Sequence, residues 1–416
     1  MIELATDDAR RAAELAARAS YGRLVAYLAR RWRDVGAAED ALGDAFVAAL
    51  ATWPRDGVPE KPEAWLLAAA RRRLLDGARH ATVQTRALPT IHAVVDEAQG
   101  AASSERVFPD ERLGLLFVCA HPAIDEGMRT PLMLQTVLGL DAARIAAAFV
   151  VPAATMGQRL VRVKTKIRDA GIGFEVPETR ELPLRLGPVL EAIYAAYGSG
   201  WDDVAGADTR RQGLAEEAIW LGRLVTRLVP DEPEAHGLLA LMLHCEARRG
   251  ARRDAAGGYV PLSEQDPTGW SWPVIEEAER ILLAAARAGK PGRFQLEAAV
   301  QSAHAQRGIT GRTDWAAIGL LYGGLIGIAP TVGATVARAA ALAEAEGADR
   351  GLAALNAMPA DAIAGYQPFW ALQAHLLGRL ARTEEAARAY ARAIELASDR
   401  AVRAFLAEKE RALWPA

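Results

Sequence analysis

The stretch from Leu138 to Gly171 limits the folds open to this chain more than any other part of the sequence. It reads as two helices joined by a tight turn. Asp141 can cap the first helix, and Pro152 ends it, because proline disfavours helical geometry in the residue before it. The first helix has three apolar residues on one face: Ile145, Ala146 and Phe149. The second has a predicted buried stripe: Met156, Leu160, Val163 and Ile167.

The second helix also carries basic and amide side chains outside its apolar stripe: Gln158, Arg159, Arg162 and Lys166. Two short helices with this chemistry on the second are typical of a helix-turn-helix, whose second helix enters the major groove of DNA. The alternative is a helical hairpin with a solvated basic face.

The composition predicts an all-α protein with more than one domain. The chain has 416 residues, 51% of them apolar, and is rich in alanine and other helix formers. Basic side chains slightly exceed acidic ones in residues 1–171, whereas acidic ones exceed basic ones in 172–416. Two cysteines give no disulfide framework, and we find neither a signal peptide nor a membrane-spanning run. We therefore expect a cytoplasmic protein with no membrane contact.

A helix is expected between Gly36 and Pro54. Its inner face is predicted to hold three large apolar residues: Leu42, Phe46 and Leu50. Its outer face carries three carboxylates: Glu39, Asp40 and Asp44. Because an acidic surface repels DNA, a basic protein partner is the better candidate for this face.

A further helix is expected from Ala64 to His80. Three residues are predicted to pack inward: Trp65, Ala69 and Leu75. Four arginines form a basic patch: Arg71, Arg72, Arg73 and Arg79. An aromatic side chain beside clustered arginines suits single-stranded or melted DNA, where stacking and phosphate contacts act together.

Residues 81–109 have the small and polar composition of a linker, and helical periodicity resumes with residue 110. Cys119 and His121 lie close together, but no further metal ligands follow at short spacing, so we interpret both as core residues. No P-loop, nucleophile elbow or zinc motif is present. We therefore predict no cofactor, no metal and no catalytic residue.

The serial order of these parts resembles an extracytoplasmic-function sigma factor of the sigma-70 family. The resemblance rests on AEDALGDAF, EAWLLAAARRRLLD and the helix-turn-helix, and it continues through EEAIWLGRLV, LLALMLHCEARRGAR and EQDPTGW. These later motifs are similar to those of the subgroup with a long helical C-terminal extension. The resemblance implies a region 2-like domain at 1–80, a linker at 81–109, a region 4-like domain at 110–171 and an extension at 172–416.

The resemblance also implies roles for the residues. Glu39, Asp40 and Asp44 would bind core RNA polymerase. The tryptophan and arginines of the 64–80 helix would engage the melted −10 element of the promoter: Trp65, Arg71, Arg72, Arg73 and Arg79. The second helix of the helix-turn-helix would read the −35 element: Gln158, Arg159, Arg162 and Lys166.

The extension has a repeat signature near its end. Five residues fall at the spacing of a 34-residue tetratricopeptide helix pair: Trp370, Ala374, Ala386, Tyr390 and Ala393. We expect a tetratricopeptide-like array that regulates or scaffolds the preceding domains through intramolecular contact. The competing hypothesis is a protein that keeps the sigma shape but serves as a ligand-binding, interaction or catalytic scaffold without transcription activity.

Overall fold

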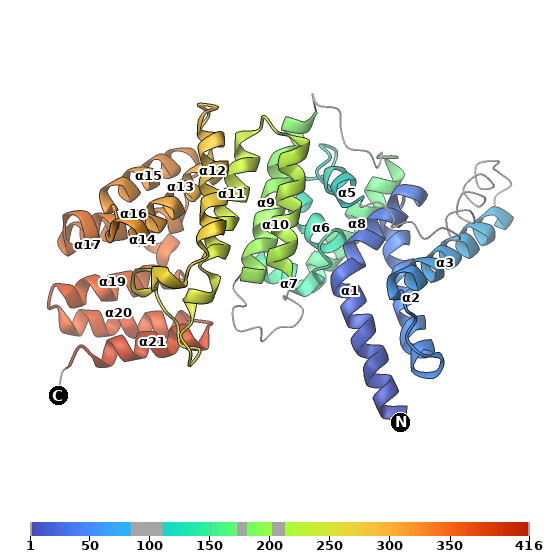
Figure 1. The fold of residues 1–416 in the computed structure, drawn as a ribbon, viewed down its shortest axis with the longest axis horizontal. Helices are drawn as coiled ribbons and strands as arrows, with labels where there is room; N and C mark the ends of the chain where they lie inside the picture. The colour runs from blue at the N-terminus through green and yellow to red at the C-terminus, as the bar shows by residue number, and fades with distance from the viewer. Residues whose placement is uncertain (1, 85–110, 150, 173–180, 202–212, 415–416) are drawn as a thin grey trace. The chain divides into compact units, whose positions relative to one another are not determined.

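The chain folds into helices in a computed structural model (Figure 1). The structure describes residues 2–84, 111–149, 151–172, 181–201 and 213–414. No β-strand occurs in these ranges, apart from an isolated bridge between Arg253 and Tyr259, so the prediction of an all-α fold is confirmed. The chain divides into two compact units, Met1–Ala196 and Tyr197–Ala416.

The first unit begins with three helices: α1 (Ile2–Trp32), α2 (Val35–Asp56) and α3 (Pro62–Gln84). Asp34 caps α2, since its carboxylate accepts a hydrogen bond of 3.0 Å from the amide of Ala37. α2 ends at Gly57, whose positive φ of 86° is one that glycine adopts readily. α1 packs against α2 and α3, and large apolar side chains fill the space between them: Leu24, Leu28, Leu42, Trp53 and Leu66.

The inner faces of α2 and α3 differ from the sequence prediction. Leu42 is buried, but Phe46 is half-buried and Leu50 is 48% exposed. The side of α2 that packs inward is instead lined mainly by alanines: Ala38, Ala41, Ala45 and Ala49. In α3 the buried residues are Leu66, Leu67, Ala70, Arg71 and Leu74, whereas the predicted Trp65, Ala69 and Leu75 are half-buried. Small side chains can line a close helix–helix contact, so on α2 alanines are buried while the larger Phe46 and Leu50 are not.

The helix-turn-helix is part of a second group of helices in the same unit: α5 (Arg112–Cys119), α6 (Glu126–Thr136), α7 (Ala142–Ala148) and α8 (Ala153–Asp169). The carboxylate of Asp141 caps α7 by accepting a 2.9 Å hydrogen bond from the amide of Arg144. All four predicted stripe residues of α8 are buried: Met156, Leu160, Val163 and Ile167. Ile145 and Ala146 are buried as well, but Phe149 is 39% exposed where the turn begins.

The two groups of helices pack against each other within the first unit. α1 contacts α5 and α6, and α2 contacts α8. At Gly22 in α1 the backbones come so close that an added Cβ atom would lie 1.8 Å from the carbonyl oxygen of Val137. The predicted linker lies largely outside the described residues, and α3 extends to Gln84. α9 (Leu182–Trp201) follows and contains the boundary between the two units.

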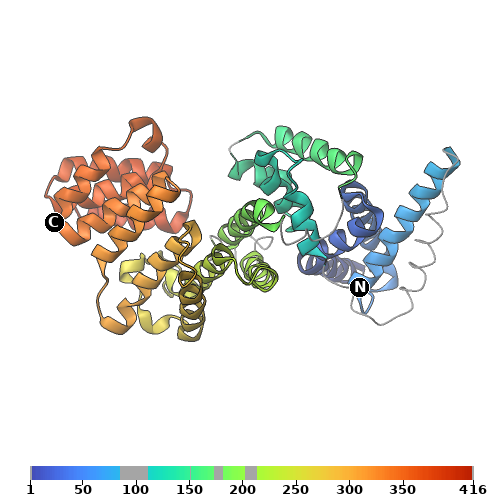
Figure 2. The same ribbon diagram turned by 90° about the horizontal axis from the view of Figure 1, so that it is seen from above.

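The second unit is an array of helices in which neighbours in sequence pack on one another (Figures 1 and 2). Its helices are α10 (Leu214–Leu228), α11 (Pro233–Ala247), η1 (Arg249–Arg252), η2 (Leu262–Glu264), η3 (Pro267–Gly269), α12 (Trp272–Ala286), α13 (Arg293–Ala305), α14 (Arg307–Thr310), α15 (Trp315–Ile328), α16 (Val332–Glu346), α17 (Ala348–Asn356), α18 (Ala360–Ile363), α19 (Gln367–Arg379), α20 (Thr383–Leu396) and α21 (Arg400–Arg411).

The expected repeat near the end of the chain coincides with the packed helices α19 and α20. Four of its five signature residues are buried and Trp370 is half-buried; the buried ones are Ala374, Ala386, Tyr390 and Ala393. In the described part of the chain, no helix is both long and apolar enough to cross a membrane.

Candidate functional site

Fewer arginines are exposed on α3 than the run of three arginines in its sequence suggests. Arg72 and Arg73 are exposed, and the guanidinium of Arg73 lies 3.5 Å from the carboxylate of Asp44 in α2. Arg71 instead turns inward and donates a hydrogen bond to the hydroxyl of Tyr27 in α1. Burial lowers the pKa of Arg71. Three consecutive residues of a helix span about 200° of its circumference, so this run reaches from the exposed side of α3 to its packed side at Arg71.

The placement of Arg71 removes it from the set of residues that can reach DNA in this structure. The Arg79 side chain lies outside the described part of the chain, although its backbone belongs to α3. Trp65 stands at the start of α3, where its ring meets the buried ring of Trp53 edge-on, with centroids 5.5 Å apart. This contact holds the half-buried Trp65 next to the turn between α2 and α3, close to the exposed Arg72 and Arg73 in sequence.

The outer face of α8 carries all four residues predicted to read the −35 element. Gln158, Arg159, Arg162 and Lys166 are exposed. Sequence reasoning missed Val161 and Thr165, which are also exposed on α8; Val161 is 63% exposed despite its apolar side chain. A helical projection at 100° per residue places both residues opposite the buried stripe, so the sequence periodicity could have predicted their exposure.

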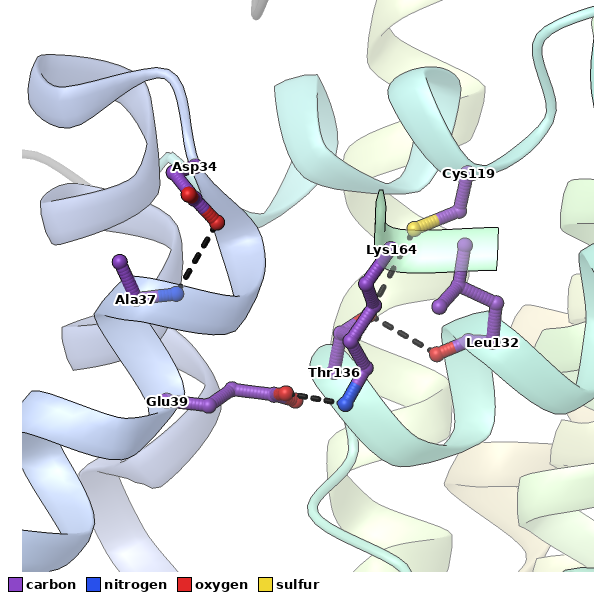
Figure 3. A network of polar contacts seen from close by, with 7 residues as sticks. All are labelled: Asp34, Ala37, Glu39, Cys119, Leu132, Thr136 and Lys164. Atoms are coloured by element: carbon purple, nitrogen blue, oxygen red, sulfur yellow. Dashed lines mark hydrogen bonds and ion pairs between the residues drawn. The ribbon is translucent and has the colours of Figure 1, made fainter. Parts of the chain in front are cut away.

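The three carboxylates on the outer side of α2 differ in their exposure to solvent. Asp40 and Asp44 are exposed, whereas Glu39 is directed at α8 and pairs with Lys164 (Figure 3). Both side chains of this pair are nearly covered, at 10% exposure for Glu39 and 13% for Lys164. Burial raises the pKa of the Glu39 carboxyl above its usual range, and the neighbouring Lys164 opposes that rise.

A second ion pair joins the same two helices. The guanidinium of Arg168 in α8 lies 3.7 Å from the carboxylate of Asp34, the residue that caps α2. Two acidic groups at and near the start of α2 therefore face two cations on one side of α8. The candidate polymerase-binding surface and the candidate DNA-reading helix meet at this contact.

Cys119 lies behind the contact and has a structural role. Its thiol is 3.5 Å from the hydroxyl of Thr136, which donates to the carbonyl of Leu132 (Figure 3). Burial raises the pKa of Cys119 to about 12, so the thiol is neutral at physiological pH. His121 is not a core residue as predicted: it lies half-exposed in the turn after α5, where its Nδ1 accepts from the amide of Ala123.

The described residues contain no group of three or more His, Cys, Asp or Glu side chains placed to hold a metal ion. In the second unit His244 is buried on α11, and burial lowers its pKa to about 4. The neighbouring Cys245 is half-buried.

Two family models match the chain. The model described as sigma-70 region 2 matches residues 18–83, which hold the second half of α1, all of α2, and α3 except Gln84. A second model, described as a family of unknown function (DUF6596), matches residues 185–286, from α9 to the end of α12.

Comparison with curated proteins finds three relatives. "Uncharacterized protein R00370" of Rhizobium meliloti (strain 1021) is 37% identical over 384 residues, which cover 91% of this chain and 90% of that protein. The "ECF RNA polymerase sigma factor SigC" of Mycobacterium tuberculosis (strain CDC 1551 / Oshkosh) is 31% identical over 156 residues, 38% of this chain and 77% of that protein. The "Probable RNA polymerase sigma-C factor" of Mycobacterium bovis (strain ATCC BAA-935 / AF2122/97) matches equally well. No solved structure matches at comparable significance.

Proposed function

The chain belongs to the sigma-70 family of RNA polymerase sigma factors and carries an extra C-terminal domain, and we propose that it acts as a promoter-specificity subunit. In this role it would bind core RNA polymerase and direct initiation at −35 and −10 elements, in the manner of extracytoplasmic-function sigma factors. Such work takes place in the cytoplasm and needs no catalytic residue from the sigma factor itself.

The observation that carries the proposal is the exposed polar row on α8, on the second helix of a helix-turn-helix. Arg159, Arg162 and Lys166 supply positive charge for phosphates, and Gln158 supplies an amide that can pair with an adenine edge. The apolar Val161, which is also exposed on α8, suits contact with a thymine methyl group. This mixture fits base reading better than phosphate binding alone.

The −10 contact in this proposal rests on Trp65, Arg72 and Arg73. An aromatic ring fixed at the end of a helix offers a stacking platform for an unpaired base, and the two exposed arginines can hold the flanking phosphates. Arg71 has no part in this set, because it is bonded to Tyr27. Arg71 would act indirectly, by fixing α3 against α1.

The polymerase contact would use Asp40 and Asp44 on the exposed side of α2, joined by Glu39 once its pairing with Lys164 is released. Carboxylates at the rim of an interface speed association with a basic partner and help to select it. Substituting Asp40 and Asp44 by asparagine should therefore slow the binding of core polymerase, and more so at low salt.

The C-terminal domain would be a built-in regulator or scaffold of tetratricopeptide-like design. A domain fused to the DNA-binding part acts at a high effective concentration without needing high intrinsic affinity. Truncation after Trp201 tests its role, because the part of α9 that belongs to the first unit is kept. More transcription from the cognate promoter would indicate inhibition, less would indicate scaffolding, and no change would exclude control by this domain.

The central test mixes the purified chain with core polymerase and follows open-complex formation on the promoter upstream of its own gene. We expect a stable complex and promoter melting that depends on the added chain. Absence of binding to core polymerase would refute the sigma-factor proposal and leave the interaction-scaffold hypothesis in its place.

A further inference from the structure

A pocket of about 380 Å³ lies in the second unit, where α12 meets the end of α13 and α14. Its volume falls within the range of small-molecule sites, roughly 300–1,000 Å³. We propose that this pocket binds a small organic cation, a primary amine with an apolar body. The lining includes three apolar residues, two acidic ones and one basic one: Trp272, Ile275, Ile309, Glu276, Glu279 and Arg280. None of these residues belongs to the surfaces of the proposed function, and the amine site does not rest on that function.

The apolar part of the pocket is built around a tryptophan. Trp272 is the first residue of α12, and its ring packs on α14, where a Cβ atom at Gly308 would lie 2.4 Å from the ring atom Cζ2. Glycine at position 308 therefore leaves room for this ring. Ile275, one turn further along α12, is buried, whereas Ile309 is 70% exposed. An apolar ligand body that covers Ile309 removes this surface from water, which favours binding.

The pocket also has an excess of negative charge. Glu276 and Glu279 follow Trp272 on α12 at intervals of four and three residues, so the three side chains share one face of the helix. In the described part of the chain, neither carboxylate forms an ion pair with a lysine or an arginine. Arg280 supplies one positive charge to the lining against two negative ones, which leaves one negative charge in excess.

Two neighbours hold Glu279 without neutralising it. Ser302 of α13 donates a hydrogen bond of 2.6 Å to its Oε1. The Nε2 atom of His244 in α11 lies 3.7 Å from the same oxygen, and neither ring nitrogen of this buried histidine has a hydrogen-bond partner among the described residues. Burial, together with the charge of Arg248, lowers the pKa of His244 to about 4, so its ring is neutral at pH 7. The positive charge that would balance Glu279 is therefore left for a ligand to supply.

These features favour one class of ligand. The two carboxylates repel an anion. A metal ion would lack ligands, since the described ranges contain no group of three or more His, Cys, Asp or Glu side chains placed to hold one. A purely apolar ligand would leave Glu279 without a charge partner. An organic ammonium ion suits both parts of the pocket, because it can donate hydrogen bonds to the carboxylates while the ring face of Trp272 attracts its charge.

Isothermal titration calorimetry of the full chain at pH 7 tests the requirement for positive charge. The probes are phenethylammonium, phenethyl alcohol and phenylpropionate, which share a phenyl ring on a short chain and differ in the charge at its end. We expect phenethylammonium to bind ~10-fold more tightly than the neutral and the anionic probe, because only its charge is opposite to that of the pocket.

Substitutions test the two parts of the pocket separately. Glu279→Gln keeps an acceptor for Ser302 but removes the charge, so it should weaken phenethylammonium binding ~10-fold and leave phenethyl alcohol binding unchanged. Ile309→Ser alters an exposed side chain and should weaken the binding of both probes ~3-fold. Glu384→Gln is the matched control, because it removes an exposed carboxylate of α20 that does not line the pocket, and it should bind phenethylammonium like the unsubstituted chain.

Three results would overturn the proposal. One is equal affinity for the three probes, and another is no binding of phenethylammonium at about 10 mM. The third is a loss in Glu384→Gln as large as in Glu279→Gln, which would mean that the acidic surface attracts the amine without a specific site. Thermal denaturation shows whether each variant is folded, and if Glu279→Gln is not, Glu276→Gln repeats the charge test at an exposed position.

Discussion

The slope of DNA-binding affinity against salt concentration should reflect how many cations of α8 contact phosphates. Three cations of α8 are exposed on the predicted DNA-reading surface: Arg159, Arg162 and Lys166. Each phosphate contact adds about 0.9 to the steepness with which log K falls against log salt. Arg162→Ala should therefore lower the steepness by about 0.9 and cost about 1–3 kcal/mol of binding free energy.

Arg168→Ala is the matched comparison on the same helix. Because Arg168 pairs with Asp34, its removal should leave the salt dependence of DNA binding nearly unchanged. Fluorescence anisotropy with a labelled duplex between 50 and 300 mM salt, roughly the range in which such contacts are resolved, gives both slopes. Equal slopes for Arg162→Ala and the unsubstituted chain would refute the assignment of α8 as the DNA-reading helix. A loss of slope in Arg168→Ala as large as in Arg162→Ala would refute the claim that pairing with Asp34 keeps Arg168 from the phosphates.

Three further predictions concern the other surfaces and the second unit. Trp65→Ala should weaken binding to single-stranded −10 DNA by about 1–3 kcal/mol while duplex −35 binding is unchanged, and electrophoretic titration of both probes checks this. Gly351→Ala should lower the free energy of unfolding by about 1–3 kcal/mol, because its Cβ would lie 2.4 Å from that of Ala343. Gly327→Ala, where a Cβ atom meets nothing within 4 Å, should not lower the free energy of unfolding, and urea denaturation compares the two variants. His244→Gln should reduce the acid sensitivity of the second unit. The native His244 has its pKa lowered from 6.5 to about 4, so the unfolded chain binds the proton first and stability falls by about 1–3 kcal/mol between those pH values; unfolding at pH 7 and pH 5 measures the difference.

Local periodicity was enough to predict the buried stripe of α8 correctly. The stripe of α8 repeats at one helical period with large apolar residues, and its four members are buried. The same rule failed on α2, because alanines occupy the packed side while Leu50 points outward. The size of an apolar residue predicts its burial only where the packed helices are far enough apart to leave space for large side chains.

The sequence predicted the chemical character of the candidate site, but not which of its side chains are bonded within the protein. That α3 is basic and α2 acidic follows from the sequence, and the family match agrees with the order of these parts. That Arg71 is bonded to Tyr27 and Glu39 to Lys164 does not follow, since 44 and 125 residues separate the partners. Such pairings depend on how helices dock, which no short-range pattern encodes.

The alanine-lined side of α2 limits which substitutions this sequence can accept during evolution. Ala38, Ala41, Ala45 and Ala49 are each no more than 5% exposed, so nearly every replacement except glycine or serine adds atoms where none fit. In a saturation scan these positions should tolerate fewer residues than the larger, half-buried Phe46. Among diverging relatives, the smallest side chains of this helix should therefore be the slowest to change.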